Sequence, residues 1–255
     1  MEWYFIFDGD PQIGLEKDNN GYPKIRANKE NIGEKLNKYS NDNNIKIDFV
    51  ICAGDLTQGG KDAKKILFYK NGEYNELGIF IDKYYNNIKN NGYNVYCCPG
   101  NHDTYVSFPY FWKPVFKFLK DKYDATYGLG IFTNWKNYGY YKFEHNGVLF
   151  MSLGVYPYNL SWIRKNLPKD NTKPIIIFYH YNTIIGEPYS DWWSNEEKNN
   201  FYNIIKEFNI LMIINGHLHS SQKDIWNGIP IVKGSGKELG LVKIKDNKIS
   251  EIKFI

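Results

Sequence analysis

The stretch Cys97-Cys98-Pro99-Gly100-Asn101-His102-Asp103 decides how this chain is interpreted, because chemically active residues follow directly on an expected strand. The apolar run that ends at Cys98 predicts the strand, and the Pro-Gly pair stops it. An amide, an imidazole and a carboxylate then occupy three consecutive positions. Burying such groups without partners costs free energy, so a hydrophobic core has little use for them. A metal site that also faces a phosphate would use all three.

Four other fragments repeat this pattern, in which an apolar strand ends in residue types that bind metals. They cover residues 6–12, 50–55, 177–180 and 213–219, and four of the five histidines lie in these fragments or in the first stretch. Active sites of α/β sheets lie at such strand ends. Asp, Asn and His together suit manganese, iron or zinc. Glycines precede several candidate ligands and permit sharp turns and close backbone approach.

The composition fits a globular domain with a sizeable core. The chain has 255 residues, of which 42% are hydrophobic, and a net charge of +4. No linker or repeat divides it, so a single domain over residues 1–255 is expected. Arg26 and Arg164 are the only arginines. The arginine guanidinium forms paired hydrogen bonds by which proteins commonly recognise phosphate and guanine. The scarcity of arginine therefore argues against a dedicated nucleic-acid binder, although a nuclease remains an open alternative.

The cysteines and apolar runs indicate the compartment. Cys52, Cys97 and Cys98 are an odd, low number in strand-like runs, which predicts buried free thiols and no disulfide framework. The apolar run 3–7 is too short for a signal peptide and lacks a basic flank. No stretch approaches the roughly 20 apolar residues of a membrane span. We therefore expect a cytoplasmic protein with no membrane partner.

Alternating apolar runs and amphipathic segments predict an α/β fold with parallel early strands and later antiparallel hairpins. Strands are expected at residues 3–7, 47–52, 94–98, 138–144, 148–153, 174–179, 210–214, 229–233, 239–244 and 249–254. Helices are expected at residues 29–39, 75–90, 110–122, 160–166 and 195–208. Ser194 is the expected N-cap of the last helix. Asn146-Gly147 and Asp246-Asn247 indicate two hairpin turns.

The order of the motifs resembles the calcineurin-like metallophosphoesterase family. Its pattern is Asp-x-His, Gly-Asp, Gly-Asn-His-Asp/Glu, His and Gly-His-x-His, and the resemblance runs from Asp8 to His219. It implies a four-layer sandwich in which two mixed β-sheets are flanked by helices. It also implies two metal ions that share one bridging Asp.

The resemblance assigns roles to individual residues. The implied ligands are Asp10 and His219 for the first ion, Asn101, His180 and His217 for the second, and Asp55 between the two. His102 would not be a ligand and would face the scissile phosphate, where it stabilises charge or protonates the leaving oxygen. Asp103 would orient His102.

The first motif departs from the family pattern, because Gln12 stands where histidine is usual. Asp-Pro-Gln recurs in a branch that includes a protein serine/threonine phosphatase, and the family's manganese-dependent hydrolases of ADP-ribose and nucleotide diphosphates resemble it there. An amide oxygen is a harder ligand than imidazole, which favours Mn or Fe over Zn. Asp8 and Asp10 could each be the motif's Asp. The preceding Gly9 favours Asp10, and Asp8 equally fits a supporting contact or a surface turn.

Two expected loops, 14–28 and 181–191, follow soon after candidate site residues, and long loops beside a site commonly set specificity. The candidate substrate contacts are Tyr105, Tyr181, Trp192 and Trp193. The two tryptophans could stack on an aromatic or nucleoside group, although anchoring the loop is the favoured role. Phosphate contacts from the first loop could come from Lys17, Lys24 and Arg26, for which solvated positions are favoured.

The favoured interpretation is a dinuclear-metal-dependent phosphoester hydrolase. Its substrate would be a phosphomonoester on a small molecule or a phosphoprotein. Alternatives are a nucleotide pyrophosphatase that acts on ADP-ribose-like molecules and a phosphodiesterase or nuclease. A non-catalytic binding scaffold of the same fold is the alternative from another class. The motifs, intact except at Gln12, argue against that scaffold.

Overall fold

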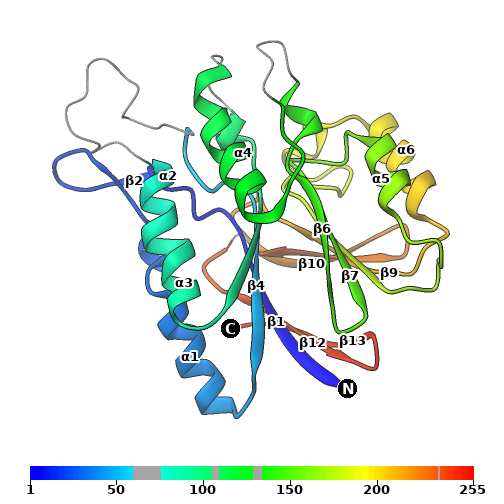
Figure 1. Cartoon of the computed structure of the whole chain (residues 1–255), viewed down its shortest axis with the longest axis horizontal. Coiled ribbons are helices and arrows are strands. Elements are labelled where there is room, and N and C mark those ends of the chain that lie inside the picture. Colours follow the sequence, from blue (N-terminus) through cyan, green and yellow to red (C-terminus); the bar gives the residue numbers. More distant parts are fainter. Residues whose placement is uncertain (60–75, 105–108, 129–133, 235) are drawn as a thin grey trace.

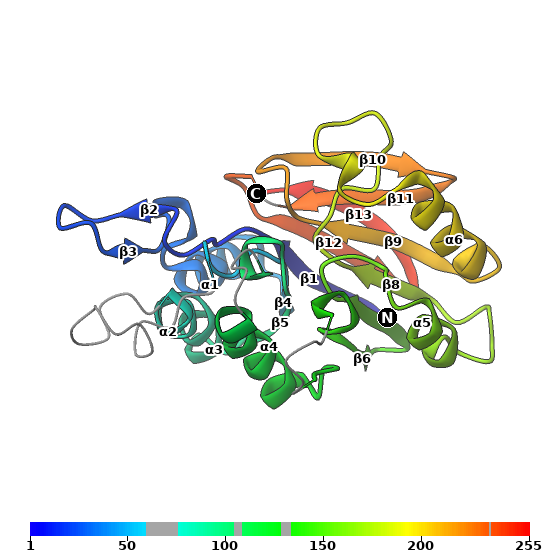
Figure 2. The same ribbon diagram turned by 90° about the horizontal axis from the view of Figure 1, so that it is seen from above.

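The computed structural model of the chain describes residues 1–59, 76–104, 109–128, 134–234 and 236–255, with only the backbone described at 109–113. Two mixed β-sheets lie face to face, and helices cover both outer sides (Figure 1 and Figure 2). The order of layers is therefore helix, sheet, sheet, helix. This is the four-layer α/β sandwich expected from the sequence.

The first sheet carries the strands that lead into three of the site fragments. Strands β1, β4 and β5 are parallel, as the early β–α–β–α–β order predicts, while β12 runs antiparallel to β1. Because parallel strands end at the same edge of a sheet, the residues that follow β1, β4 and β5 meet there. The strand order is β13 (Lys248–Phe254), β12 (Gly240–Lys245), β1 (Glu2–Asp8), β4 (Ile47–Ala53) and β5 (Asn94–Cys98).

The second sheet supplies the other two fragments from the ends of β8 and β9. Strands β7, β8, β9 and β11 are parallel, and β6 and β10 complete antiparallel hairpins at the two edges. Strand β10 was not predicted, because its sequence, Ser-Gln-Lys-Asp-Ile-Trp, has no apolar alternation. The strand order is β10 (Ser221–Trp226), β11 (Ile229–Gly234), β9 (Ile210–Asn215), β8 (Ile175–Phe178), β7 (Val148–Leu153) and β6 (Tyr140–His145).

Both predicted hairpin turns are confirmed. Asn146 and Gly147 connect β6 to β7 with φ of 46° and 81°. Asp246 and Asn247 connect β12 to β13 with φ of 50° and 59°. Two consecutive positive φ values fit the turn whose twist matches the flanking antiparallel strands.

The helices lie on the outer faces of the sheets (Figure 2). Ser194 caps α6 as predicted, in a capping box with Glu197. Within the described ranges, no helix is long and apolar enough to cross a bilayer. The helices of the first sheet are α1 (Ile32–Asn43), α2 (Glu76–Ile79), a π-helical turn (Phe80–Tyr85), α3 (Asn86–Asn90) and α4 (Pro109–Tyr123), and those of the second are α5 (Leu160–Asn166) and α6 (Asn195–Ile205).

Four expected segments differ in detail. The helix expected at 29–39 starts only after Asn31, whose left-handed φ of 53° breaks the helical backbone. The helix expected at 75–90 is divided by the π-helical turn, and residue 75 lies outside the described part. The helix expected at 195–208 ends at Ile205. The loop expected at 14–28 contains a small hairpin of β2 (Glu16–Lys17) and β3 (Pro23–Lys24), followed by a 3₁₀ turn (Ala27–Lys29).

Aromatic side chains fill the space between the two sheets. Phe49 stacks on Phe5 with ring centroids 5.3 Å apart, and it meets Phe150 of the facing sheet edge-on at 5.3 Å. Burying each such side chain contributes about 1.5–3 kcal/mol. Cys52, Cys97 and Cys98 are buried free thiols, as predicted. This packing holds the strand ends in place, and the site is built on those ends.

Candidate metal centre

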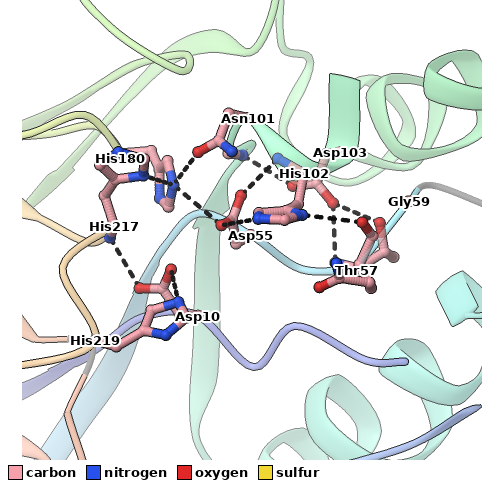
Figure 3. A network of polar contacts seen from close by, with 12 residues as sticks. Asp10, Asp55, Thr57, Gly59, Asn101, His102, Asp103, His180, His217 and His219 are labelled. Carbon is pink, nitrogen blue, oxygen red and sulfur yellow. Dashed lines mark hydrogen bonds and ion pairs between the residues drawn. The ribbon is translucent and has the colours of Figure 1, made fainter. Parts of the chain in front are cut away.

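The five fragments meet at one rim of the paired sheets (Figure 3). Two groups of ligand-type side chains form among the described residues: Asp10, Asp55 and His219 in one, and Asp55, His180 and His217 in the other. The ligand atoms of each group lie within 4.8 Å of one another, so each group is compact enough for one ion. Because Asp55 belongs to both groups, the geometry supports a carboxylate that bridges two ions.

His180 lies at the middle of the second group. Its Nε2 is 2.9 Å from Asn101 Oδ1, 3.1 Å from His217 Nδ1 and 3.2 Å from Asp55 Oδ2. Its Nδ1 donates to the carbonyl oxygen of Ala53 at 2.9 Å. Such a backbone contact fixes the tautomer of a metal-binding histidine and directs the other nitrogen toward the ion. Asn101 therefore joins the second group as a fourth converging side chain.

Asp10 and Gln12, which follow the end of β1, lie at the first group. Asp10 Oδ2 accepts a hydrogen bond from the His217 N–H at 3.0 Å, and Asp10 Oδ1 lies 3.5 Å from His219 Nε2. Gln12 is 1% exposed, and its Oε1 has no hydrogen-bond partner among the described residues. A buried amide oxygen without a partner is costly unless a ligand satisfies it. The residues present therefore fit a metal ion.

Backbone strain concentrates at the same positions. Apart from Asn, Asp and Gly, positive φ occurs in the described chain only at Gln12, His217, His219 and Tyr189. Such conformations are uncommon for these residue types, cost about 1–3 kcal/mol each and cluster at functional sites. The φ values of the candidate ligands are 52° at Asp10, 42° at Gln12, 48° at Asp55, 75° at His217 and 51° at His219.

Two glycines allow the fragments to approach one another. A Cβ atom at Gly100 would lie 2.1 Å from Asp55 Oδ1, and one at Gly54 would lie 2.5 Å from His180 Nδ1. Gly54 also has a φ of +89°, which favours glycine. Larger side chains would displace the neighbouring ligands, which gives the Gly-Asp and Gly-Asn pairs of the sequence a physical reason.

Burial and mutual charge set the protonation of the cluster. Burial alone lowers the pKa of His180, but the Asp55 carboxylate raises it to about 9. Burial, reinforced by the charge of His180, lowers the pKa of His217 to about 3. Burial opposes ionisation of Asp10, yet its interaction with His219 and the charge of His180 leave its pKa below the usual value. A proton on His180 thus holds these groups together, and a metal ion would replace that proton.

His102 faces the rim and is held by a backbone group. Its Nδ1–H donates to the carbonyl oxygen of Gln58 at 3.0 Å, and its Nε2 lies 4.0 Å from Asp55 Oδ2. The side chain is 24% exposed, so it remains accessible at the edge of the cluster. The contact with Gln58 was not predicted, because a backbone carbonyl leaves no motif in a single sequence.

The predicted role of Asp103 is corrected by its hydrogen bonds. The described hydrogen-bond donors to its carboxylate are groups other than the His102 ring, whose Nδ1–H donates to the Gln58 carbonyl instead. Because donors from two loops take both of its oxygens, this buried carboxylate joins the loops that follow β4 and β5. Burial and the nearby Asp55 raise the pKa of Asp103 to about 7. The donors, at 2.7–3.1 Å, are the N–H groups of Leu56, Thr57 and Gly100 and the Thr57 hydroxyl.

Asp8, the other candidate for the first motif, is engaged outside the cluster. Its carboxylate pairs with the ammonium group of Lys29 and accepts a hydrogen bond from the Tyr84 hydroxyl at 2.9 Å. All three side chains are buried. Lys29 also donates to the carbonyl oxygen of Gly236 at 3.2 Å. Asp8 therefore anchors the end of β1, and Asp10 is the carboxylate that reaches the site.

The four candidate substrate contacts have different surroundings. Trp193 is buried, and its indole N–H donates to a backbone carbonyl of its own loop, which fits the favoured role of anchoring that loop. Tyr181 is buried too, because it packs against another tyrosine. Trp192 is 37% exposed, with its ring 4.7 Å from that of His217. Tyr105 lies outside the described residues.

The basic residues of the first loop also differ in how far they are buried. Lys17 and Lys24 are exposed, as expected of solvated positions. Arg26 is partly buried, and its guanidinium donates to the carbonyl oxygen of Asp10 at 3.0 Å. Arg26 therefore supports the backbone of a candidate ligand, a role that its place in a polar loop did not indicate.

Comparisons with known proteins agree with this geometry. The family model described as calcineurin-like phosphoesterase matches residues 9–221. A dimetal phosphatase from Danio rerio is similar with a TM-score of 0.56 and 11% identity, over 99% of this chain and 98% of that one. The anchor in the inner membrane complex of Plasmodium has a TM-score of 0.61 and 14% identity, over 100% and 84%. A 5′-nucleotidase from Candida albicans has a TM-score of 0.54 and 15% identity, over 94% and 48%.

The structural matches, at these identities, show a shared fold, and the chain spans about half the length of the nucleotidase, 48%. A search of curated protein sequences gives no match. The family match is broader evidence, because it encloses every candidate ligand from Asp10 to His219. The chain therefore belongs to the calcineurin-like phosphoesterase family, whose members hydrolyse phosphoester bonds with the help of two metal ions.

Proposed function

We propose that this protein hydrolyses phosphomonoesters, phosphoproteins among them, at a dinuclear centre within one domain of residues 1–255. The observation that carries the proposal is the pair of ligand groups that share Asp55. The buried Gln12 Oε1, which lacks a hydrogen-bond partner in the described chain, and the strained backbone of the ligands support it. The buried free thiols fit the cytoplasm, where cysteines stay reduced.

Each ion has its own set of residues in this proposal. With an amide oxygen in place of an imidazole, the first set favours Mn or Fe over Zn. When bound, the ions neutralise charge on the phosphoryl oxygens and lower the pKa of the attacking water. The first set is Asp10, Gln12 and His219, the second is Asn101, His180 and His217, and Asp55 belongs to both.

His102 acts on the leaving group. Because Nδ1–H donates to Gln58, the ring presents Nε2 toward Asp55 at the rim. A proton on Nε2 can pass to the leaving oxygen as the phosphorus–oxygen bond breaks. Asp103 contributes indirectly, because it joins the loops that carry Asp55 and Asn101.

Replacing His102 by alanine should lower kcat for phenyl phosphate by about 10²-fold or more, the usual contribution of a general acid. Metal content by mass spectrometry should stay at two ions, because His102 is not a ligand in this proposal. The control is His145→Ala, which removes a histidine paired with Asp48 at 2.8 Å, away from the cluster. Loss of one ion from the His102 variant would show that this residue is a ligand.

Replacing Gln12 by alanine should weaken binding of the first ion at least tenfold. Changing residues that merely support a ligand costs about 10–100-fold in affinity, so a direct ligand should cost no less. Gln12→His should restore two-ion binding and shift the preference toward Zn. Titration with Mn and Zn followed by metal analysis measures both effects, with Gln222→Ala at an exposed position of β10 as the control. Unchanged Mn affinity in Gln12→Ala would remove Gln12 from the ligand set.

A substrate panel distinguishes the proposed function from its alternatives. The purified protein, after metal analysis, is supplied with a phosphomonoester, a phosphodiester and ADP-ribose. We expect the highest kcat/KM with the monoester. Preference for the diester would support a phosphodiesterase or nuclease, and preference for ADP-ribose would support a nucleotide pyrophosphatase. No turnover with Mn, Fe, Zn or Ni would support a scaffold, a role compatible with the fold shared with the Plasmodium anchor.

A further inference from the structure

The loop of residues 181–193 lies between β8 and α6 (Figure 2). Side-chain contacts hold it at several points. The buried ammonium group of Lys198 donates to the Ser190 carbonyl. Lys233, a buried residue of β11, pairs with Glu187 of the loop. The Asn182 amide donates to Glu187 Oε2 at 2.9 Å. A loop with this many buried anchors presents its remaining side chains in fixed positions.

Two aromatic rings of this loop stay exposed beside the metal centre. Tyr189 is 54% exposed and Trp192 is 37% exposed, and their rings meet edge-on with centroids 5.9 Å apart. Both rings adjoin His217 of the second ligand group, at 5.4 Å for Tyr189 and 4.7 Å for Trp192. Large exposed apolar side chains next to a polar cluster are typical of a ligand-binding surface.

The backbone of Tyr189 gives an independent reason to assign it a function. Its φ is 57°, a left-handed conformation that is uncommon for a bulky side chain. The other described residues with positive φ, apart from Asn, Asp and Gly, are Gln12, His217 and His219, and all three are candidate ligands. Strain of this kind persists where the surrounding structure imposes it, and it clusters at active sites and ligand clamps.

We propose that Tyr189 and Trp192 bind an aromatic ring in the leaving group of the phosphoester, so that aryl or nucleoside phosphates are preferred over alkyl phosphates. The proposal rests on the proposed function, because it places the leaving group beside the ions. Stacking on protein aromatic rings accepts any planar ring, and removing such a ring typically weakens binding about tenfold or more. In this proposal Trp192 keeps its predicted role as a substrate contact, and Tyr189 is an additional substrate contact that the sequence did not indicate.

A different role for the two rings would be to orient His217 alone, since they pack around its imidazole. The two roles predict different losses. Removing a ring that only orients a ligand would weaken metal binding and affect all phosphoesters alike. Removing a ring that binds the leaving group would affect aromatic ligands only and leave the metal content unchanged.

Phenylphosphonate and methylphosphonate separate these roles, because their carbon–phosphorus bonds are not esters and binding is measured without turnover. Calorimetry on the metal-loaded protein should show that phenylphosphonate binds about tenfold more tightly. Trp192→Leu should remove this preference. Tyr189→Asn should do the same while keeping a residue that tolerates the left-handed backbone. Two ions should remain bound in both variants.

The control is Tyr158→Leu, because Tyr158 is also 37% exposed and contacts another tyrosine. It should keep the preference for phenylphosphonate. The proposal is overturned if the wild-type protein binds both phosphonates equally or binds neither, if the two loop variants keep the preference, or if they lose an ion. Hydrolysis of phenyl and methyl phosphate is measured in parallel. A phenyl preference in binding without any hydrolysis would leave the aromatic site standing and refute the proposed function.

Discussion

Asp55→Asn is expected to abolish phosphoester hydrolysis, with a loss in kcat/KM on the order of 10³-fold or more, since removing even one charge-stabilising group costs 10²–10³-fold. Asp55 belongs to both ligand groups, and its Oδ2 lies 3.2 Å from His180 Nε2. An amide at this position keeps the shape but loses the negative charge that two cations would share. Removing this charge should therefore weaken the binding of both ions. Phenyl phosphate assays and metal analysis of the same preparation measure the two effects together.

Asp48→Asn is a matched control for this variant, because Asp48 lies on β4, the strand that leads to Asp55. It pairs with His145 and contributes nothing to the cluster. Activity and metal content should remain near the wild-type values. The two-ion assignment is wrong if Asp55→Asn retains full activity, and Asp55 is not a bridge if the variant loses only one ion.

Lys29→Met is expected to lower the free energy of unfolding by about 3–5 kcal/mol, the cost of leaving a buried charge without its partner. Lys29 is 1% exposed and pairs with the fully buried Asp8. Methionine fills a similar volume, so the loss comes mainly from the unpaired carboxylate. Urea unfolding followed by circular dichroism measures it. The variant should also bind metals less well, since Asp10 follows closely after Asp8, the last residue of β1.

Two further variants make this prediction specific. Lys38→Met breaks an exposed pair with Asp42 at 2.7 Å and should change the stability by no more than about 1 kcal/mol. Asp8→Asn in the Lys29→Met background should recover much of the stability, because no buried charge then remains unpaired. Equal unfolding midpoints for Lys29→Met and the wild-type protein would contradict a structural role for the pair.

The sequence predicts the main strands well because the signals that indicate a strand are local. Strands β5 and β7 are predicted at their observed bounds, since each is an apolar run closed by a turn. Candidate ligands such as Asp55 and His180 could be found because each stands directly after such a run. The topology then brings them together without any further signal.

The supporting contacts could not be predicted because they join distant segments. Lys29 meets Asp8 only once the first loop folds back over β1. Gln58 holds His102 through a backbone carbonyl, which every residue type possesses. The left-handed backbone of Tyr189 likewise depends on the folded loop. Burial also separates Trp193 from Trp192, although the two are adjacent in the sequence.

The pairing of β1 with β12 has a consequence for the order of folding. Phe5 lies opposite Val242, so one side of β1 is completed by residues that are far along the chain. Closing so large a loop is entropically slow, whereas the parallel partner β4 is much nearer in sequence. The strand that leads to Asp10 therefore remains half-paired until the C-terminal hairpin docks. A chain still under synthesis should accordingly be unable to retain the first ion, and metal uptake should belong to the last stage of maturation.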